Sequence, residues 1–88
     1  NLPTAFSPNG DGQNDVFRVL GTKYVQSVEL RVYNRWGQEV FYSNEKEQGW
    51  DGTFKGQPAP TGVYAYTLVA TLTNGEVIHK KGNVTLKR

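Results

Sequence analysis

The sequence predicts an all-β domain, folded as a sandwich of about six or seven strands. Three observations support this prediction. Wherever apolar residues cluster, they alternate with polar residues at a period of two, as they do on half-buried strands. Turn-forming residues recur roughly every 8–12 positions, a spacing typical of sandwiches and small barrels. No segment longer than one turn keeps a helical period, so we expect no helix.

The strands are expected in four clear segments. Residues 28–33 place three aliphatic side chains on one face and mostly polar groups on the other. Residues 38–43 repeat the alternation, which puts Val40 and Tyr42 on the same face. Residues 63–72 are rich in β-branched and aromatic side chains, and both faces are partly apolar, as in a central strand. A last strand alternates through residues 84–87.

Turn signals separate these strands. Arg35-Trp36-Gly37 predicts a tight hairpin, and Asn74-Gly75 predicts a hairpin with a type I′ turn. Residues 58–62 contain two prolines, which lack amide donors, so we expect a connection there and no ladder strand. Gly82 interrupts the last strand and suggests a bulge.

Composition excludes several classes of protein. The 88 residues suffice for one domain, and an aromatic share of 12% argues against disorder. No apolar run reaches the ~18–20 residues of a membrane helix, so the chain is not expected to span a membrane. The absence of cysteine excludes disulfides and thiolate metal sites. A net charge of +2 is too small to demand a nucleic-acid partner, and glutamates are scattered through the same strands.

The polar segment 7–15 is the least strand-like part of the chain, and it carries Asn9, Asp11 and Asp15 around two glycines. Oxygen ligands at alternate positions, followed by glycine, are what a calcium loop requires, so these three residues are candidate calcium ligands. The terminal glutamate and the flanking helices of an EF-hand are missing. The alternative is a loop whose side chains satisfy neighbouring backbone amides. Calorimetry with calcium and a chelator control distinguishes the two.

Catalysis is not expected from these residues. His79 is the only histidine, and no serine lies in a nucleophile-elbow pattern. Glu45 and Glu47 are close in sequence but lie in an expected loop, and so small a core has little room for a cleft that would hold two carboxylates at a defined separation. The sequence therefore argues against an enzyme.

The candidate contact residues lie at two places. Arg35 and Trp36 occupy a hairpin tip, where the indole can project into solvent, whereas Trp50 between two glycines is expected to be tucked over a turn. The chain carries no acidic residue from His79 onward, where four basic residues form a basic end. Its members are Lys80, Lys81, Lys87 and Arg88. Such lysines either contact an electronegative partner or keep a strand edge soluble.

Five segments in order resemble the gliding motility-associated C-terminal domain, also called the type B sorting domain of the type IX secretion system in Bacteroidota. They are residues 6–17 (FSPNGDGQNDVF), 33–41 (YNRWGQEVF), 49–52 (GWDG), 60–66 (PTGVYAY) and 82–88 (GNVTLKR). The resemblance covers nearly the whole chain. It implies an immunoglobulin-like β-sandwich of antiparallel strands.

The resemblance also implies a non-enzymatic sorting signal, which directs an attached cargo from the periplasm through the outer-membrane translocon to the cell surface or the medium. A PorP/SprF-type outer-membrane protein is the implied partner. We expect residues 1–88 to be a monomeric C-terminal module of a larger secreted protein. The alternatives are an adhesive or carbohydrate-binding sandwich, suggested by exposed aromatic residues, and a nucleic-acid-binding barrel, which the scattered glutamates disfavour.

Overall fold

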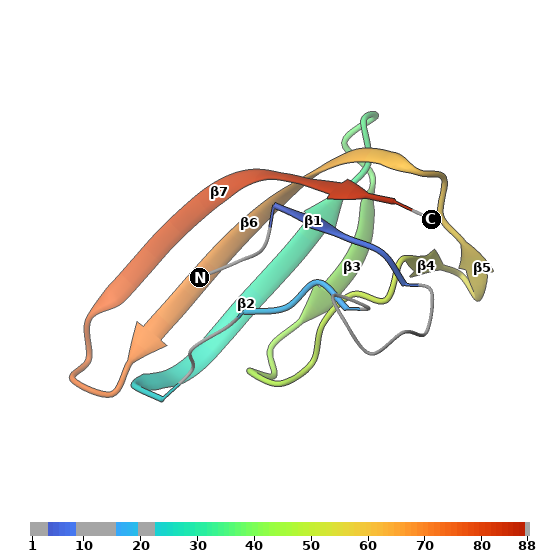
Figure 1. The fold of residues 1–88 in the computed structure, drawn as a ribbon. Coiled ribbons are helices and arrows are strands. Elements are labelled where there is room, and N and C mark those ends of the chain that lie inside the picture. The colour runs from blue at the N-terminus through green and yellow to red at the C-terminus, as the bar shows by residue number, and fades with distance from the viewer. Residues whose placement is uncertain (1–3, 9–15, 20–22, 88) are drawn as a thin grey trace.

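The computed structural model describes residues 4–8, 16–19 and 23–87, and these form an all-β fold, as predicted (Figure 1). The described residues contain seven strands in two sheets. The strands are β1 (Ala5–Phe6), β2 (Val25–Tyr33), β3 (Glu39–Ser43), β4 (Thr53–Phe54), β5 (Gln57–Pro58), β6 (Gly62–Leu72) and β7 (Val77–Leu86).

The larger sheet has five strands in the order β1-β7-β6-β2-β3, and β4 and β5 form a second, two-stranded sheet. All pairings are antiparallel except one, because β1 lies parallel to β7. The amides of Thr85 and Lys87 donate to the carbonyls of Thr4 and Phe6, each at 2.9 Å. A tight hairpin forces antiparallel pairing, but no hairpin joins β1 to β7, so turn signals could not predict their relative direction.

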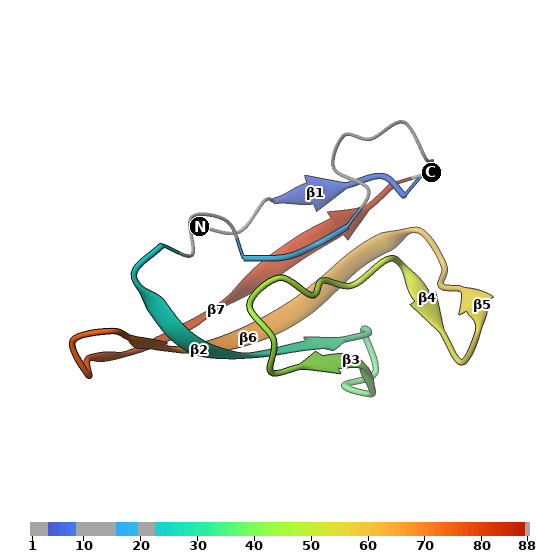
Figure 2. The same ribbon diagram turned by 90° about the horizontal axis from the view of Figure 1, so that it is seen from below.

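The core lies on one face of the larger sheet. There Phe17 and Trp50 exchange backbone hydrogen bonds of 2.8 and 2.9 Å, which link two segments of the covering layer (Figure 2). Their rings join those of Phe6, Tyr64 and Tyr66, with centroids 4.8–6.0 Å apart in the closest pairs. The indole of Trp50 donates to the carbonyl of Thr53 at 2.8 Å. Trp50 is therefore buried, as predicted, and its one polar atom is satisfied.

A bulge in β3 changes the predicted faces of that strand. Val32 pairs with Phe41 and Tyr33 pairs with Glu39, which leaves Val40 as an additional residue. Val40 is buried and Phe41 packs partly against the core, whereas Tyr42 is exposed on the opposite face. The prediction that Val40 and Tyr42 share a face is wrong, because one additional residue reverses the alternation beyond it.

The type I′ turn lies at a different hairpin from the predicted one. At Asn74-Gly75 the amide of Gly75 donates to Leu72 and the amide of Leu72 donates to Glu76, which closes a three-residue loop. Only Gly75 has a positive φ there (90°), whereas a type I′ turn needs two such residues. Between β4 and β5, Lys55 and Gly56 both have positive φ, at 54° and 78°, as that turn requires.

Two further predictions near proline and glycine are wrong. Pro58 belongs to a ladder, since it pairs with Thr53, but the strand is a two-residue edge where a missing amide donor is tolerated. Gly82 forms no bulge, because the β6–β7 register runs without a shift. Gly82 instead leaves space for a ring: a Cβ atom there would lie 2.9 Å from the hydroxyl of Tyr66.

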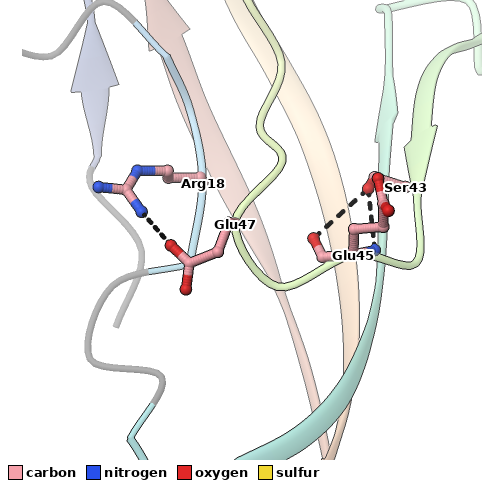
Figure 3. A network of polar contacts seen from close by, with 4 residues as sticks. All are labelled: Arg18, Ser43, Glu45 and Glu47. Carbon is pink, nitrogen blue, oxygen red and sulfur yellow. Dashed lines mark hydrogen bonds and ion pairs between the residues drawn. The ribbon is translucent and has the colours of Figure 1, made fainter.

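The loop from β3 to Trp50 is anchored on both sides (Figure 3). The buried hydroxyl of Ser43 accepts from the amide of Glu45 at 3.1 Å and donates to Gln48 at 2.9 Å. On the other side, Arg18 forms an ion pair with Glu47 at 3.1 Å. These contacts hold the loop at the position from which Trp50 enters the core.

Candidate partner-binding site

The β2–β3 hairpin tip, residues 35–37, is held in one shape by Asn34. The amide of Gly37 donates to the carbonyl of Asn34 at 3.0 Å, and the amide of Asn34 donates to the carbonyl of Gln38 at 2.9 Å. The side-chain oxygen of Asn34 accepts from the amides of Trp36 and Gln38, both at 3.0 Å. An asparagine that satisfies backbone amides two and four residues ahead fixes a turn locally. The predicted hairpin is therefore confirmed, and its tip is ordered by its own sequence.

Arg35 and Trp36 form a stacked pair on this tip. The Arg35 guanidinium lies 4.4 Å from the centroid of the Trp36 ring, within the range of a cation–π contact. Trp36 is 75% exposed, whereas Trp50 is 1% exposed. Among the described residues, no carboxylate forms an ion pair with Arg35. The tip thus presents an apolar ring and a positive charge that the fold does not use.

A hollow of about 310 Å³ lies beside the tip. The tip forms one wall, and the other wall comes from the β4–β5 hairpin and the segment that leads into β6. The hydroxyl of Tyr64 donates to the carbonyl of Pro60 at 2.6 Å and ties this segment down. Most of the lining is apolar. The lining residues are Asn34, Arg35, Trp36, Val40, Phe54, Gln57, Pro58, Ala59, Pro60, Thr61, Gly62, Val63 and Tyr64.

Sequence reasoning did not predict this hollow, although it singled out the tip. The walls meet only through tertiary packing, because residues 34–40 and 54–64 belong to different hairpins. One signal was present: two prolines near an aromatic residue give a stiff apolar wall. By itself, that signal indicates only a connection between strands.

The predicted basic end is divided between two places. Lys80 and Lys81 are exposed and lie opposite Leu68 and Thr67, midway along β6. Lys87 follows Leu86, which pairs with Gly62 at the edge of the hollow, so Lys87 lies at the same end of the sheet as the tip. Six residues of strand span about 20 Å, which separates Lys87 from Lys81. Arg88 lies outside the described residues.

The outer face of the larger sheet carries a charge cluster that sequence reasoning did not identify. Arg31 forms ion pairs with Glu29 at 3.1 Å and with Glu39 at 3.4 Å, and its guanidinium lies 4.6 Å from the ring centroid of Tyr42. The hydrogen bond with Glu29 raises the pKa of Arg31 above its ordinary value. Because these groups satisfy one another, the cluster is a weaker contact candidate than Arg35.

The candidate calcium ligands Asn9, Asp11 and Asp15 lie outside the described residues, so the calcium prediction stays a prediction. Within the described ranges, no group of three or more acidic or histidine side chains is arranged to hold a metal ion. His79 is exposed on β7 opposite Val69. The described part of the chain also holds no helix that is long and apolar enough to cross a membrane.

Comparison with known proteins supports the resemblance carried by the five sequence segments. No curated protein matches the chain. The family model described as the CHU_C type IX secretion signal domain matches residues 1–86, which is nearly the whole sequence. This match includes the tip, the residues that line the hollow and all seven described strands. The chain therefore belongs to the family of type IX secretion signal domains.

Proposed function

We propose that this domain directs an attached cargo across the outer membrane through the type IX translocon, and that the hairpin tip is its principal contact with the machinery. The observation that carries the proposal is the exposed Arg35–Trp36 stack, held rigid by Asn34 beside an apolar hollow. The domain acts as a sorting signal that is recognised in its folded state, and it has no enzymatic role.

The chemistry of the tip suits a protein partner. Tryptophan and arginine are the residue types that most often dominate the free energy of protein–protein binding. A side chain of the partner can enter the hollow while Trp36 packs against the partner's surface, which removes apolar area of both molecules from water. Because Arg35 is already stacked and the turn is hydrogen-bonded, little conformational entropy is lost on binding.

The other proposed parts of the pathway follow from the family. The cargo passes through the periplasm and reaches the cell surface or the medium, and a PorP/SprF-type outer-membrane protein receives the domain as a monomer. Lys87, at the same end of the sheet as the tip, contributes a further positive charge to this contact. Arg88, Lys80 and Lys81 remain candidate contacts of the same machinery.

An export assay tests the proposal. A fluorescent protein with a signal peptide is fused before residues 1–88 and expressed in a gliding bacterium that has its own type IX system and the cognate outer-membrane partner. Trp36→Ala and Arg35→Glu should each retain the reporter in the periplasm. The matched control is Tyr24→Ala, because Tyr24 is also exposed (65%) and also lies beside a cation, Lys23, at 5.3 Å, but at the other end of β2.

The outcomes separate recognition from folding. Purified variants are first checked by circular dichroism, so that a loss of export cannot come from an unfolded domain. Normal export of a folded Trp36→Ala, Arg35→Glu double variant would exclude the tip as the contact. Normal export of the reporter without residues 1–88 would exclude the sorting role itself.

The exposed Trp36 ring beside a hollow also favours the second candidate function, a carbohydrate-binding or adhesive module. Aromatic faces stack on sugar rings, and the hollow would hold one ring. A glycan array with the purified domain tests this candidate. Glycan binding that is lost in Trp36→Ala but kept in Tyr24→Ala would support it. An array without a specific signal would exclude it.

A further inference from the structure

The edge of the larger sheet along β7 is unpaired over several residues. Within the described part of the chain, β7 has a second neighbour only at Thr85 and Leu86, where β1 pairs with it. Residues 77–81 therefore have β6 on one side and no described strand on the other. All five of these residues are exposed. In Figure 1 this part of β7 runs along the outside of the sheet, toward the β6–β7 turn.

The backbone groups at this edge point outward at alternate residues. The amides of Thr85 and Lys87 donate toward β1, so the odd-numbered residues of β7 direct their amides and carbonyls away from β6. Successive residues of a strand point their backbone groups in opposite directions within the sheet. Because the β6–β7 register has no shift, the same parity holds back to Val77. Val77, His79 and Lys81 therefore offer a row of backbone donors and acceptors suited to another strand.

The side chains at this edge carry positive charge and some apolar area. Lys80 and Lys81 are adjacent, so they extend from opposite faces of the strand. Among the described residues, neither forms an ion pair with a carboxylate. Val77 and Ile78 are 50% and 41% exposed, and a shallow hollow of about 290 Å³ lies where His79, Lys80 and Lys81 meet β6. A strand added at the free edge would cover part of the exposed area of Val77 and Ile78.

We infer that the β7 edge at residues 77–81 binds an extended acidic segment of a partner protein, which adds to the sheet as a further strand. Backbone hydrogen bonds to Val77, His79 and Lys81 supply the register. Two consecutive acidic residues of the partner face Lys80 and Lys81, one on each side of the sheet. The surface is separate from the hairpin tip, and the inference does not depend on the sorting role.

The same lysines argue against a second copy of this chain as the occupant. Two β7 edges paired around a twofold axis would bring Lys80 and Lys81 of each copy close to those of the other, and like charges opposite one another destabilise a strand pair. Lysines on edge strands commonly prevent such self-association. An acidic strand meets the opposite condition, since the charges that repel a second copy attract its glutamates.

Binding of a defined peptide tests the inference. The probe is the capped peptide Thr-Val-Thr-Glu-Glu-Val-Thr-Val, titrated into the isotope-labelled domain and followed by nuclear magnetic resonance. The amide signals of Val77, His79 and Lys81 should shift, and their hydrogen exchange should slow. One matched peptide carries Lys-Lys in place of Glu-Glu. A second keeps the glutamates but has N-methyl groups at alternate amides, which removes its strand-forming donors.

Both control peptides should bind at least about tenfold more weakly than the probe, the factor expected for one lost hydrogen bond or charge contact.

A variant of the domain tests the same edge. His79→Pro removes one outward amide without removing a β6–β7 hydrogen bond, so it should weaken binding of the probe peptide by a similar factor. Equal binding of the N-methylated peptide to the unaltered domain would overturn strand addition in favour of simple charge attraction. Slowed exchange confined to other residues would place the peptide away from this edge. A dimer of the free domain in sedimentation, paired through residues 77–81, would assign the edge to a second copy of the chain.

Discussion

Truncation of the two tryptophans to alanine should lower the free energy of unfolding by very different amounts. Trp50 is buried to 1% exposure, touches the rings of Phe6 and Tyr64, and donates a 2.8 Å hydrogen bond to Thr53. Trp36 is 75% exposed and its ring contacts Arg35. Trp50→Ala therefore removes a central part of the core, whereas Trp36→Ala removes surface area that water already contacts.

The magnitudes follow from burial. An indole that is fully buried removes roughly 150–250 Å² from water, worth about 4–6 kcal/mol at ~25 cal/mol per Å², and measured losses for such truncations are about 3–5 kcal/mol. The quarter of Trp36 that is covered corresponds to about 1 kcal/mol by the same arithmetic. A domain of this size has a free energy of unfolding of about 4–13 kcal/mol, so Trp50→Ala removes a large share of it and unfolds the domain if its stability lies at the low end of that range.

Urea denaturation followed by far-ultraviolet circular dichroism measures both variants. Trp36→Ala should unfold at a urea concentration close to that of the unaltered domain. Trp50→Ala should lose at least about 2 kcal/mol more of its free energy of unfolding, and the slope of that free energy against urea concentration should stay unchanged if the variant still folds. Trp50→Phe serves as the conservative variant, since it keeps a ring but loses the indole donor. Equal losses for Trp36→Ala and Trp50→Ala would refute the assignment of one ring to the core and the other to the surface.

Three further substitutions test particular features. Gly82→Ala should destabilise the domain by about 1–3 kcal/mol, because its Cβ would lie 2.9 Å from the Tyr66 hydroxyl; a neutral effect in thermal unfolding would contradict the close packing. Asn34→Ala should cost about 1–2 kcal/mol and increase the mobility of Trp36, since two backbone amides lose their acceptor; unchanged fluorescence anisotropy would show that Asn34 does not order the tip. Lys55→Asn should raise the melting temperature, because asparagine adopts a positive φ more readily than lysine, and the gain is limited to ~1 kcal/mol; a lower melting temperature would argue against the left-handed conformation.

The sequence alone determined the fold class and the positions of the main strands. Alternation places Val28, Leu30 and Val32 on one face, and the structure buries all three. The turn at residues 35–37 was predictable too, because Gly37 and the side chain of Asn34 act within a few residues of each other. These features depend on local interactions, which are written directly in neighbouring residues.

Only the tertiary structure decided how distant segments meet. The parallel pairing of β1 with β7 and the hollow beside Trp36 join parts of the chain that no turn connects. The bulge at Val40 lies within a predicted hairpin, but it depends on how β3 packs against the core and not on the turn. Periodicity reports which face of a strand is apolar, but it carries no information about which strand or loop covers that face. The surfaces proposed to bind partners, the tip with its hollow and the edge of β7, exist because packing leaves them uncovered.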